Sequence, residues 1–231
     1  MKRFCLLVGL LGALGTAAMA NPVLCASGAT LDTYISGNST FANACQIGDK
    51  LFWGFAISQP TGSYGPAASG IAVTTSPGDG VTNVGIVFNS ASWVADPGFP
   101  IDQTITYNVA TLSGASIIED ATLTITGTLT TAGDTGKVIE TLTPGVAGSP
   151  ITATLPFPVS QHINFLDNMQ STFQVKDEII VSTANTAAHI SIVENDFSEA
   201  VPEPAVAILL GSGLVLIGLV RRRSVKAEEA R

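Results

Sequence analysis

One stretch decides the fold class of this chain: Ala121-Thr122-Leu123-Thr124-Ile125-Thr126-Gly127-Thr128-Leu129-Thr130. Leu123, Ile125 and Leu129 alternate with threonines, so one face of an extended segment is apolar and the other polar. Because threonine is β-branched, it favours a pleated strand over a helix. The stretch therefore predicts a half-buried β-strand whose apolar face is turned toward a core.

The same alternation recurs along the chain, and turns rich in glycine and proline separate the segments. We predict short helical turns over residues 31–35 and 165–170. Such a series of strands and turns indicates an all-β domain, an antiparallel β-sandwich of jelly-roll or immunoglobulin-like type, with a barrel as the alternative. Further strands are predicted over residues 51–57, 71–75, 84–88, 105–109, 137–142, 151–155, 173–181 and 189–193. Turns are predicted over residues 76–80, 96–98, 132–134 and 143–145.

The beginning of the chain has the pattern of a secretory signal peptide over residues 1–20. Met1-Lys2-Arg3 is positively charged, residues 4–14 are apolar, and Ala18-Met19-Ala20 is a small-x-small cleavage site. We expect a signal helix that engages the Sec translocon and is cut between Ala20 and Asn21.

Two cysteines, Cys25 and Cys45, remain in the exported chain. Paired cysteines in an oxidising compartment form a disulfide more readily than a metal site, and no histidine lies nearby to complete a tetrahedron. Closing a loop of about twenty residues would stabilise the fold by about 3 kcal/mol.

The end of the chain, residues 201–231, combines three features in a fixed order. Pro202-Glu203-Pro204 is followed by sixteen uncharged residues over 205–220 and then by Arg221-Arg222-Arg223. At about 1.5 Å per residue the apolar run makes a helix of roughly 24 Å. We expect a single, short transmembrane helix that begins after the prolines and is stopped on the cytoplasmic side by the arginines.

This tail resembles the PEP-CTERM sorting signal, with Pro202, Glu203 and Pro204 as the motif and Arg221, Arg222 and Arg223 as the membrane stop. The resemblance implies processing by exosortase. It also implies an inner-membrane-tethered precursor whose exported domain, residues 21–200, reaches the bacterial cell envelope, surface or extracellular matrix. The stretch Cys45-Gln46-Ile47-Gly48-Asp49-Lys50-Leu51-Phe52-Trp53 is similar to the opening of a group of such proteins that has no assigned activity. No functional residue follows from that similarity.

The charge of the exported segment excludes one class of partner. Residues 21–204 hold three lysines, Lys50, Lys137 and Lys176, against sixteen acidic residues, a net charge of about −13. Because this field repels phosphate backbones, we expect no nucleic-acid binding. Acidic exopolysaccharide is repelled as well, unless divalent cations bridge the two.

Catalytic patterns are missing from the sequence, so we predict no enzyme and no cofactor. The chain has no Gly-x-Ser-x-Gly, and its two histidines, His162 and His189, show no ligand-like spacing. Glu119-Asp120 and Asp177-Glu178 are adjacent acids that point to opposite faces of a strand, so neither can form a carboxylate pair. We predict that these four acids are solvated turn or edge residues.

Two patterns leave a binding function open. Asp96 and Asp102 flank Pro97-Gly98-Phe99-Pro100, and their carboxylates with backbone carbonyls are candidate Ca²⁺ ligands, although a plain turn is the simpler interpretation. Trp53, Tyr64 and Trp93 are candidates for a platform on which sugars stack. Leu51, Trp53, Phe55 and Ile57 share one face of a predicted strand, which favours core packing for Trp53.

These sequence features leave three candidate functions. The first is a non-enzymatic protein of the envelope or matrix, and the second is a carbohydrate-binding module for exopolysaccharide. The third is a secreted hydrolase. An exposed aromatic row near polar groups would favour the second, and a deep pocket with convergent acids would favour the third.

Overall fold

The computed structural model describes residues 22–76, 83–112, 116–156, 159–165, 169–185 and 187–200. The signal peptide, the cleavage site at Ala20 and Asn21 and the whole sorting tail lie outside these ranges. So do most of the predicted turn over 76–80 and the middle of the predicted helical turn over 165–170. Among the described residues, no helix is long and apolar enough to span a membrane.

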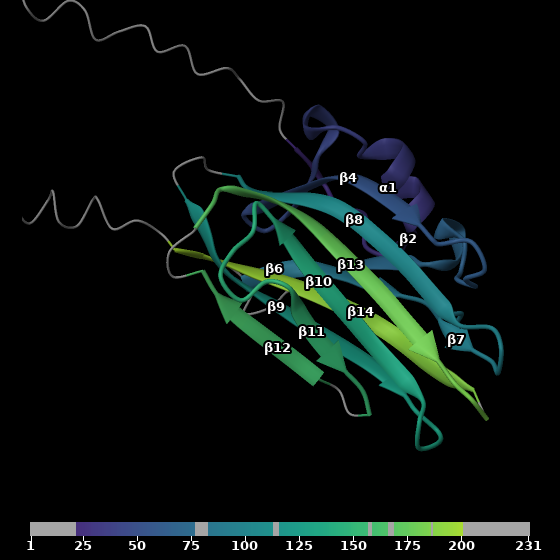
Figure 1. Cartoon of the computed structure of the whole chain (residues 1–231). Coiled ribbons are helices and arrows are strands. Elements are labelled where there is room, and N and C mark those ends of the chain that lie inside the picture. The colour runs from purple at the N-terminus through teal and green to yellow at the C-terminus, as the bar shows by residue number, and fades with distance from the viewer. Residues whose placement is uncertain are drawn as a thin grey trace, which may run out of the picture.

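Two seven-stranded sheets, counted over the described residues, stack face to face (Figure 1). The first sheet has the order β1 (Val23–Leu24), β3 (Cys45–Ile47), β4 (Lys50–Ser58), β8 (Ile101–Thr111), β13 (Thr172–Ser182), β10 (Thr135–Thr143) and β11 (Ile151–Thr154). The second has the order β12 (Val159–Asn164), β9 (Ile117–Thr128), β14 (Ala188–Ala200), β6 (Asn83–Asn89), β5 (Ala72–Ser76) and β2 (Ala29–Thr30), and β7 (Val94–Ala95) also pairs with β14.

The strand pairs are antiparallel except for β1 with β3, so the predicted antiparallel β-sandwich is confirmed. Each strand predicted from alternation is present. The strands that prediction missed are β1, β2, β3, β7 and β12, of which all but β12 span two or three residues. From β8 to β14 the chain crosses repeatedly between the sheets, so neighbouring strands are often distant in sequence.

The core lies between the two inner faces and follows the predicted alternation. On β9, Leu123 and Ile125 are fully buried while Thr122 and Thr124 are only half-buried. Burying each such side chain stabilises the fold by about 1.5–3 kcal/mol. The core therefore forms where the sequence predicts it.

Strand β4 departs from the prediction because it contains a β-bulge. Trp53 pairs with Asn108, and Ala56 pairs with Thr106. Between these two pairs β4 advances by three residues while β8 advances by two, so β4 holds one extra residue. Gly54 lies in the bulge with a φ of 69°, a left-handed conformation that favours glycine. The extra residue turns Phe52 and Phe55 into the core and leaves Trp53 only half-buried. The predicted core position of Trp53 is therefore wrong.

The start of the domain is fastened by the predicted disulfide, since Cys25 and Cys45 are bonded with their Cα atoms 4.8 Å apart. The helical turn predicted over 31–35 is the start of α1 (Leu31–Gly37), which packs against β4 (Figure 1). Tyr34 of α1 is buried against Phe55, and its hydroxyl donates to the carbonyl of Ala26 over 2.9 Å. Two short 3₁₀ helices, η1 (Phe41–Asn43) and η2 (Ala68–Gly70), complete the described elements.

Candidate functional site

Trp93, one of the three candidate platform residues, lies inside the protein. Its side chain is fully buried, and its indole Nε1 donates a hydrogen bond of 2.7 Å to Oε1 of Gln103. Because neither face of the ring reaches solvent, Trp93 cannot stack on a sugar. It is a packing residue that also holds the Gln103 amide in place.

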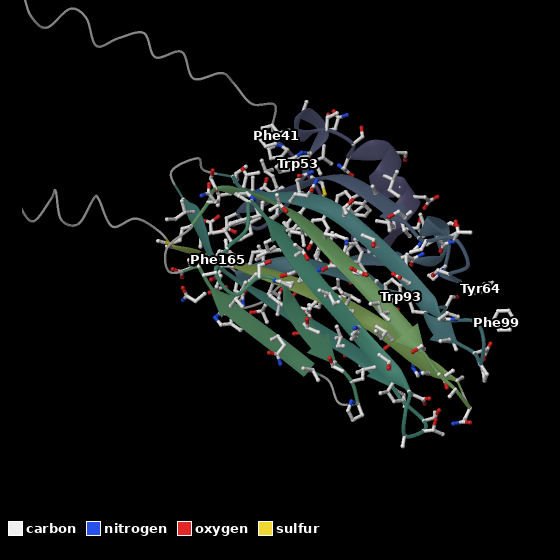
Figure 2. The ribbon with its side chains drawn as sticks, in the orientation of Figure 1. Phe41, Trp53, Tyr64, Trp93, Phe99 and Phe165 are labelled. Carbon is white, nitrogen blue, oxygen red and sulfur yellow. A yellow bond between two sulfur atoms is a disulfide. The ribbon has the colours of Figure 1, made fainter. Side chains whose placement is uncertain are left out.

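Tyr64 is exposed and has an aromatic partner that the sequence did not reveal. Half of Tyr64 and half of Phe99 are open to solvent, 51% each, and the rings meet edge to face with centroids 4.9 Å apart. Tyr64 lies in the loop after β4, and Phe99 lies in the turn between β7 and β8 (Figure 2). We call these two residues the aromatic pair.

Backbone and hydroxyl contacts fix the loop that carries Tyr64. The Tyr64 amide donates to the carbonyl of Pro100 over 3.0 Å. The Ser63 hydroxyl donates to the carbonyl of Asp102 and accepts from the Asp102 amide, each over 2.7 Å. The loop that carries Tyr64 is therefore joined to the segment that follows Phe99, which holds the backbone of both rings in place before any ligand arrives.

A groove of about 370 Å³ is lined in part by the loop that carries Tyr64, because Gly65 follows Tyr64 directly and lines it, whereas neither ring of the aromatic pair does. The Gln103 amide on its wall donates from Nε2 to the carbonyl of Pro66 over 2.9 Å, and lies 3.5 Å from Oε1 of Gln59. None of the lining residues is charged. The groove is lined by Ile57, Ser58, Gln59, Gly65, Pro66, Ala67, Ala68 and Gln103.

Asp96 and Asp102, the candidate Ca²⁺ ligands, occupy different surroundings. Asp96 is exposed, and its backbone carbonyl closes a turn by accepting from the Phe99 amide over 2.9 Å. Asp102 lies on β8 opposite Ile180. Within the described ranges, no group of three or more histidine, cysteine or acidic side chains could hold a metal ion. The two aspartates therefore lack a third acidic or histidine ligand there.

Asp177 is not a solvated residue, which corrects the prediction made for it. It is fully buried on β13, directly opposite Glu140 of β10, which is buried as well. Asn195 of β14 donates from Nδ2 to Oδ2 of Asp177 over 2.7 Å. Burial raises the pKa of Asp177 to about 7, although this hydrogen bond acts in the opposite direction.

The alternation of β13 contained the signal for this position. Phe173, Val175, Ile179 and Val181 all point inward, and Asp177 falls in the same series. Its neighbour Glu178 points outward, where it meets Lys176 at 3.3 Å, so the adjacent acids do take opposite faces as predicted. Glu119 and Asp120 are half-buried on β9, which pairs with β12 on one side and β14 on the other, so the predicted turn or edge position is wrong for them as well.

No protein-family model matches the chain, and no curated protein sequence matches it. Solved structures of low similarity include TmCBM61 in complex with β-1,4-galactotriose, at 10% identity over 78% of this chain and 99% of that chain, with a TM-score of 0.34. A mutant of the family 29 carbohydrate-binding module CBM29-2 has 8% identity over 59% and 91%, with a TM-score of 0.18. The enzymatically active domain of a tailspike protein of bacteriophage CBA120 has 15% identity over 60% and 19%, with a TM-score of 0.24. Similarity at this level carries no functional argument.

Proposed function

We propose that residues 21–200 form a non-catalytic carbohydrate-binding domain of the bacterial envelope or matrix. The observation that carries the proposal is the exposed aromatic pair, Tyr64 with Phe99, on a loop that continues into an uncharged groove at Gly65. Aromatic rings pack on the apolar faces of sugars, and an exposed amide such as that of Gln59 exchanges hydrogen bonds with sugar hydroxyls. Loops already fastened in place reduce the entropy lost on binding.

The groove supports binding over hydrolysis. Glycoside hydrolysis generally needs two carboxyl groups on either side of the bond to be broken, and the residues that line the groove supply none. One carboxyl pair that the structure brings together, Glu140 with Asp177, lies in the closed core with both side chains fully buried. A polysaccharide chain has no access to it.

The aromatic pair can be tested against a matched control elsewhere on the protein. Phe41 also packs edge to face, on Trp53, with centroids 4.9 Å apart and 44% of Phe41 exposed, but it lies away from Tyr64 and Phe99 (Figure 2). We expect the full-length protein to bind a neutral glycan on an array. Tyr64→Ala or Phe99→Ala should weaken that binding by roughly tenfold or more, since a lost aromatic contact costs about 1–2 kcal/mol.

Phe41→Ala should leave glycan affinity unchanged. Absence of glycan binding, or equal loss in Phe41→Ala and Tyr64→Ala, would show that the aromatic pair is not the site. Circular dichroism of each variant confirms that the sandwich is folded before affinities are compared.

The resemblance of the tail supports the proposed route to the envelope. Sec exports the chain, the short apolar helix holds the precursor in the inner membrane, and exosortase recognises Pro202-Glu203-Pro204 and processes the tail. The prolines keep the motif extended because neither can continue a helix backwards. A binding domain delivered in this way would meet exopolysaccharide at the cell surface.

A further inference from the structure

Four polar side chains meet in the centre of the sandwich, between the two sheets. Glu140 and Asp177 are cross-strand neighbours in the first sheet, and Asn195 reaches Asp177 from the second sheet over 2.7 Å. Tyr107 of β8 lies close enough to both acids for their charges, after burial itself, to raise its pKa well above the usual range. All four side chains are fully buried. We call these four residues the core oxygen cluster.

Most oxygens of the core oxygen cluster lack a hydrogen bond. Of the nine buried side-chain oxygens without a hydrogen-bond partner in the described part of the chain, five belong to this cluster: both of Glu140, Oδ1 of Asp177, Oδ1 of Asn195 and the Tyr107 hydroxyl. A buried polar atom without a partner costs about 1–3 kcal/mol, and a buried carboxylate costs more. Five such atoms on four neighbouring side chains point to a shared partner.

We infer that the core oxygen cluster binds one Ca²⁺ ion between the sheets. Two carboxylates balance the charge of a divalent cation, while the amide and phenol oxygens add neutral ligands. The donors are all oxygens, which excludes the sulfur and nitrogen preference of zinc. Ca²⁺ accepts irregular coordination, whereas Mg²⁺ keeps several waters that a closed core has little space to hold.

Protonation of Glu140 and Asp177 accounts for the oxygens that lack hydrogen bonds less well than a bound cation does. Burial raises the pKa of both Glu140 and Asp177, and the charge of Asp177 raises that of Glu140 further, so protons can neutralise the pair. However, protonation adds only two donors for the five cluster oxygens that lack a partner. A single cation can be coordinated by all five oxygens at once, so these oxygens need not hydrogen-bond to one another.

The position of the cluster couples the ion to folding. Its ligands come from β8, β10 and β13 of the first sheet and from β14 of the second, so they come together only when the sheets close. Ca²⁺ should therefore enter during folding and exchange slowly afterwards, and it should stabilise the folded state in proportion to the logarithm of its concentration.

The test is refolding with and without the ion. Full-length protein in mild detergent is unfolded in urea with its disulfide intact, then refolded in Ca²⁺ or in chelator. After desalting, bound metal is measured by mass spectrometry and stability by thermal unfolding. We expect one Ca²⁺ per chain and a higher unfolding midpoint in Ca²⁺.

Two variants of the cluster and one control locate the ion. Glu140→Gln and Asp177→Asn should each fold without Ca²⁺, because an amide needs no counter-ion, and should retain less than a tenth of the bound Ca²⁺. The double variant Asp96→Asn with Asp102→Asn, on the surface, should retain all of it. The inference is overturned if refolded wild-type protein binds no Ca²⁺, or if the surface variant loses the ion and the core variants keep it.

Discussion

Among single residues, Asp177 has the largest predicted effect on stability, and it acts together with Glu140. Tyr107 and Asn195 face the pair from neighbouring elements. With the pKa of Asp177 raised from 3.8 to about 7, the folded protein holds protons that the unfolded chain has already lost. The stability of protein in chelator should therefore fall as pH rises from about 4 to about 7, because the folded state has to give up these protons against the effect of burial.

The check is urea unfolding in chelator across that pH range, with the double variant Glu140→Gln and Asp177→Asn beside the wild type. The double variant should show a flatter profile, since its amides do not titrate. A wild-type free energy of unfolding that rises over the same range would contradict the assignment.

Single residues also mark where sequence-based prediction failed. The alternation of apolar and polar residues correctly predicted that Leu123 and Ile125 face the core. The same period of two, applied to β13 and β10, places Asp177 and Glu140 on the inward face. The charge of Asp177 argued for a solvated position, and that argument was wrong because Glu140 and Asn195 surround it in the core. The meeting of Tyr64 with Phe99 could not be predicted, because it depends on how two separate loops pack.

At the scale of elements, the bulge in β4 decides which aromatic rings enter the core. An alanine Cβ at Gly54 would overlap with Nδ2 of Asn108, in a backbone conformation with a φ of 69°. Gly54→Ala should lower the free energy of unfolding by about 1–2 kcal/mol for the left-handed conformation, and by more for the contact with Asn108.

Gly62→Ala is the matched control, since Gly62 has a φ of 87° with nothing within 4 Å of an added Cβ. It should show the conformational cost without the contact. Equal losses in the two variants, measured by urea unfolding, would mean that Asn108 moves aside freely. No period-two pattern reveals such a bulge, because one extra residue reverses the faces that follow it.

At the scale of the whole molecule, the proposed sorting depends on the tail and not on the domain. Replacing Pro202 and Pro204 by alanine should let the membrane helix extend backwards through Glu203, because alanine removes the ring clash and restores the amide donor. Precursor should then accumulate in the inner membrane with the domain still folded. The measurement is membrane fractionation with immunoblotting in a host that makes exosortase.

His189→Ala, in the domain, should be processed like the wild type. Mature wild-type protein should lack Arg221, Arg222 and Arg223 in mass spectra. Normal processing of the double proline variant, or intact C-terminal peptides on mature protein, would contradict the proposed role of the tail.

The placement of β14 has a mechanical consequence. This strand ends at Ala200, just before the tail, and it is hydrogen-bonded along one edge to β9 and along the other to β6. Its C-terminal end and the aromatic pair lie toward opposite ends of the sandwich (Figures 1 and 2). Tension between a tethered tail and a bound polysaccharide would thus pull β14 along its own axis. Both rows of hydrogen bonds would carry that load in shear and would have to break together rather than one after another.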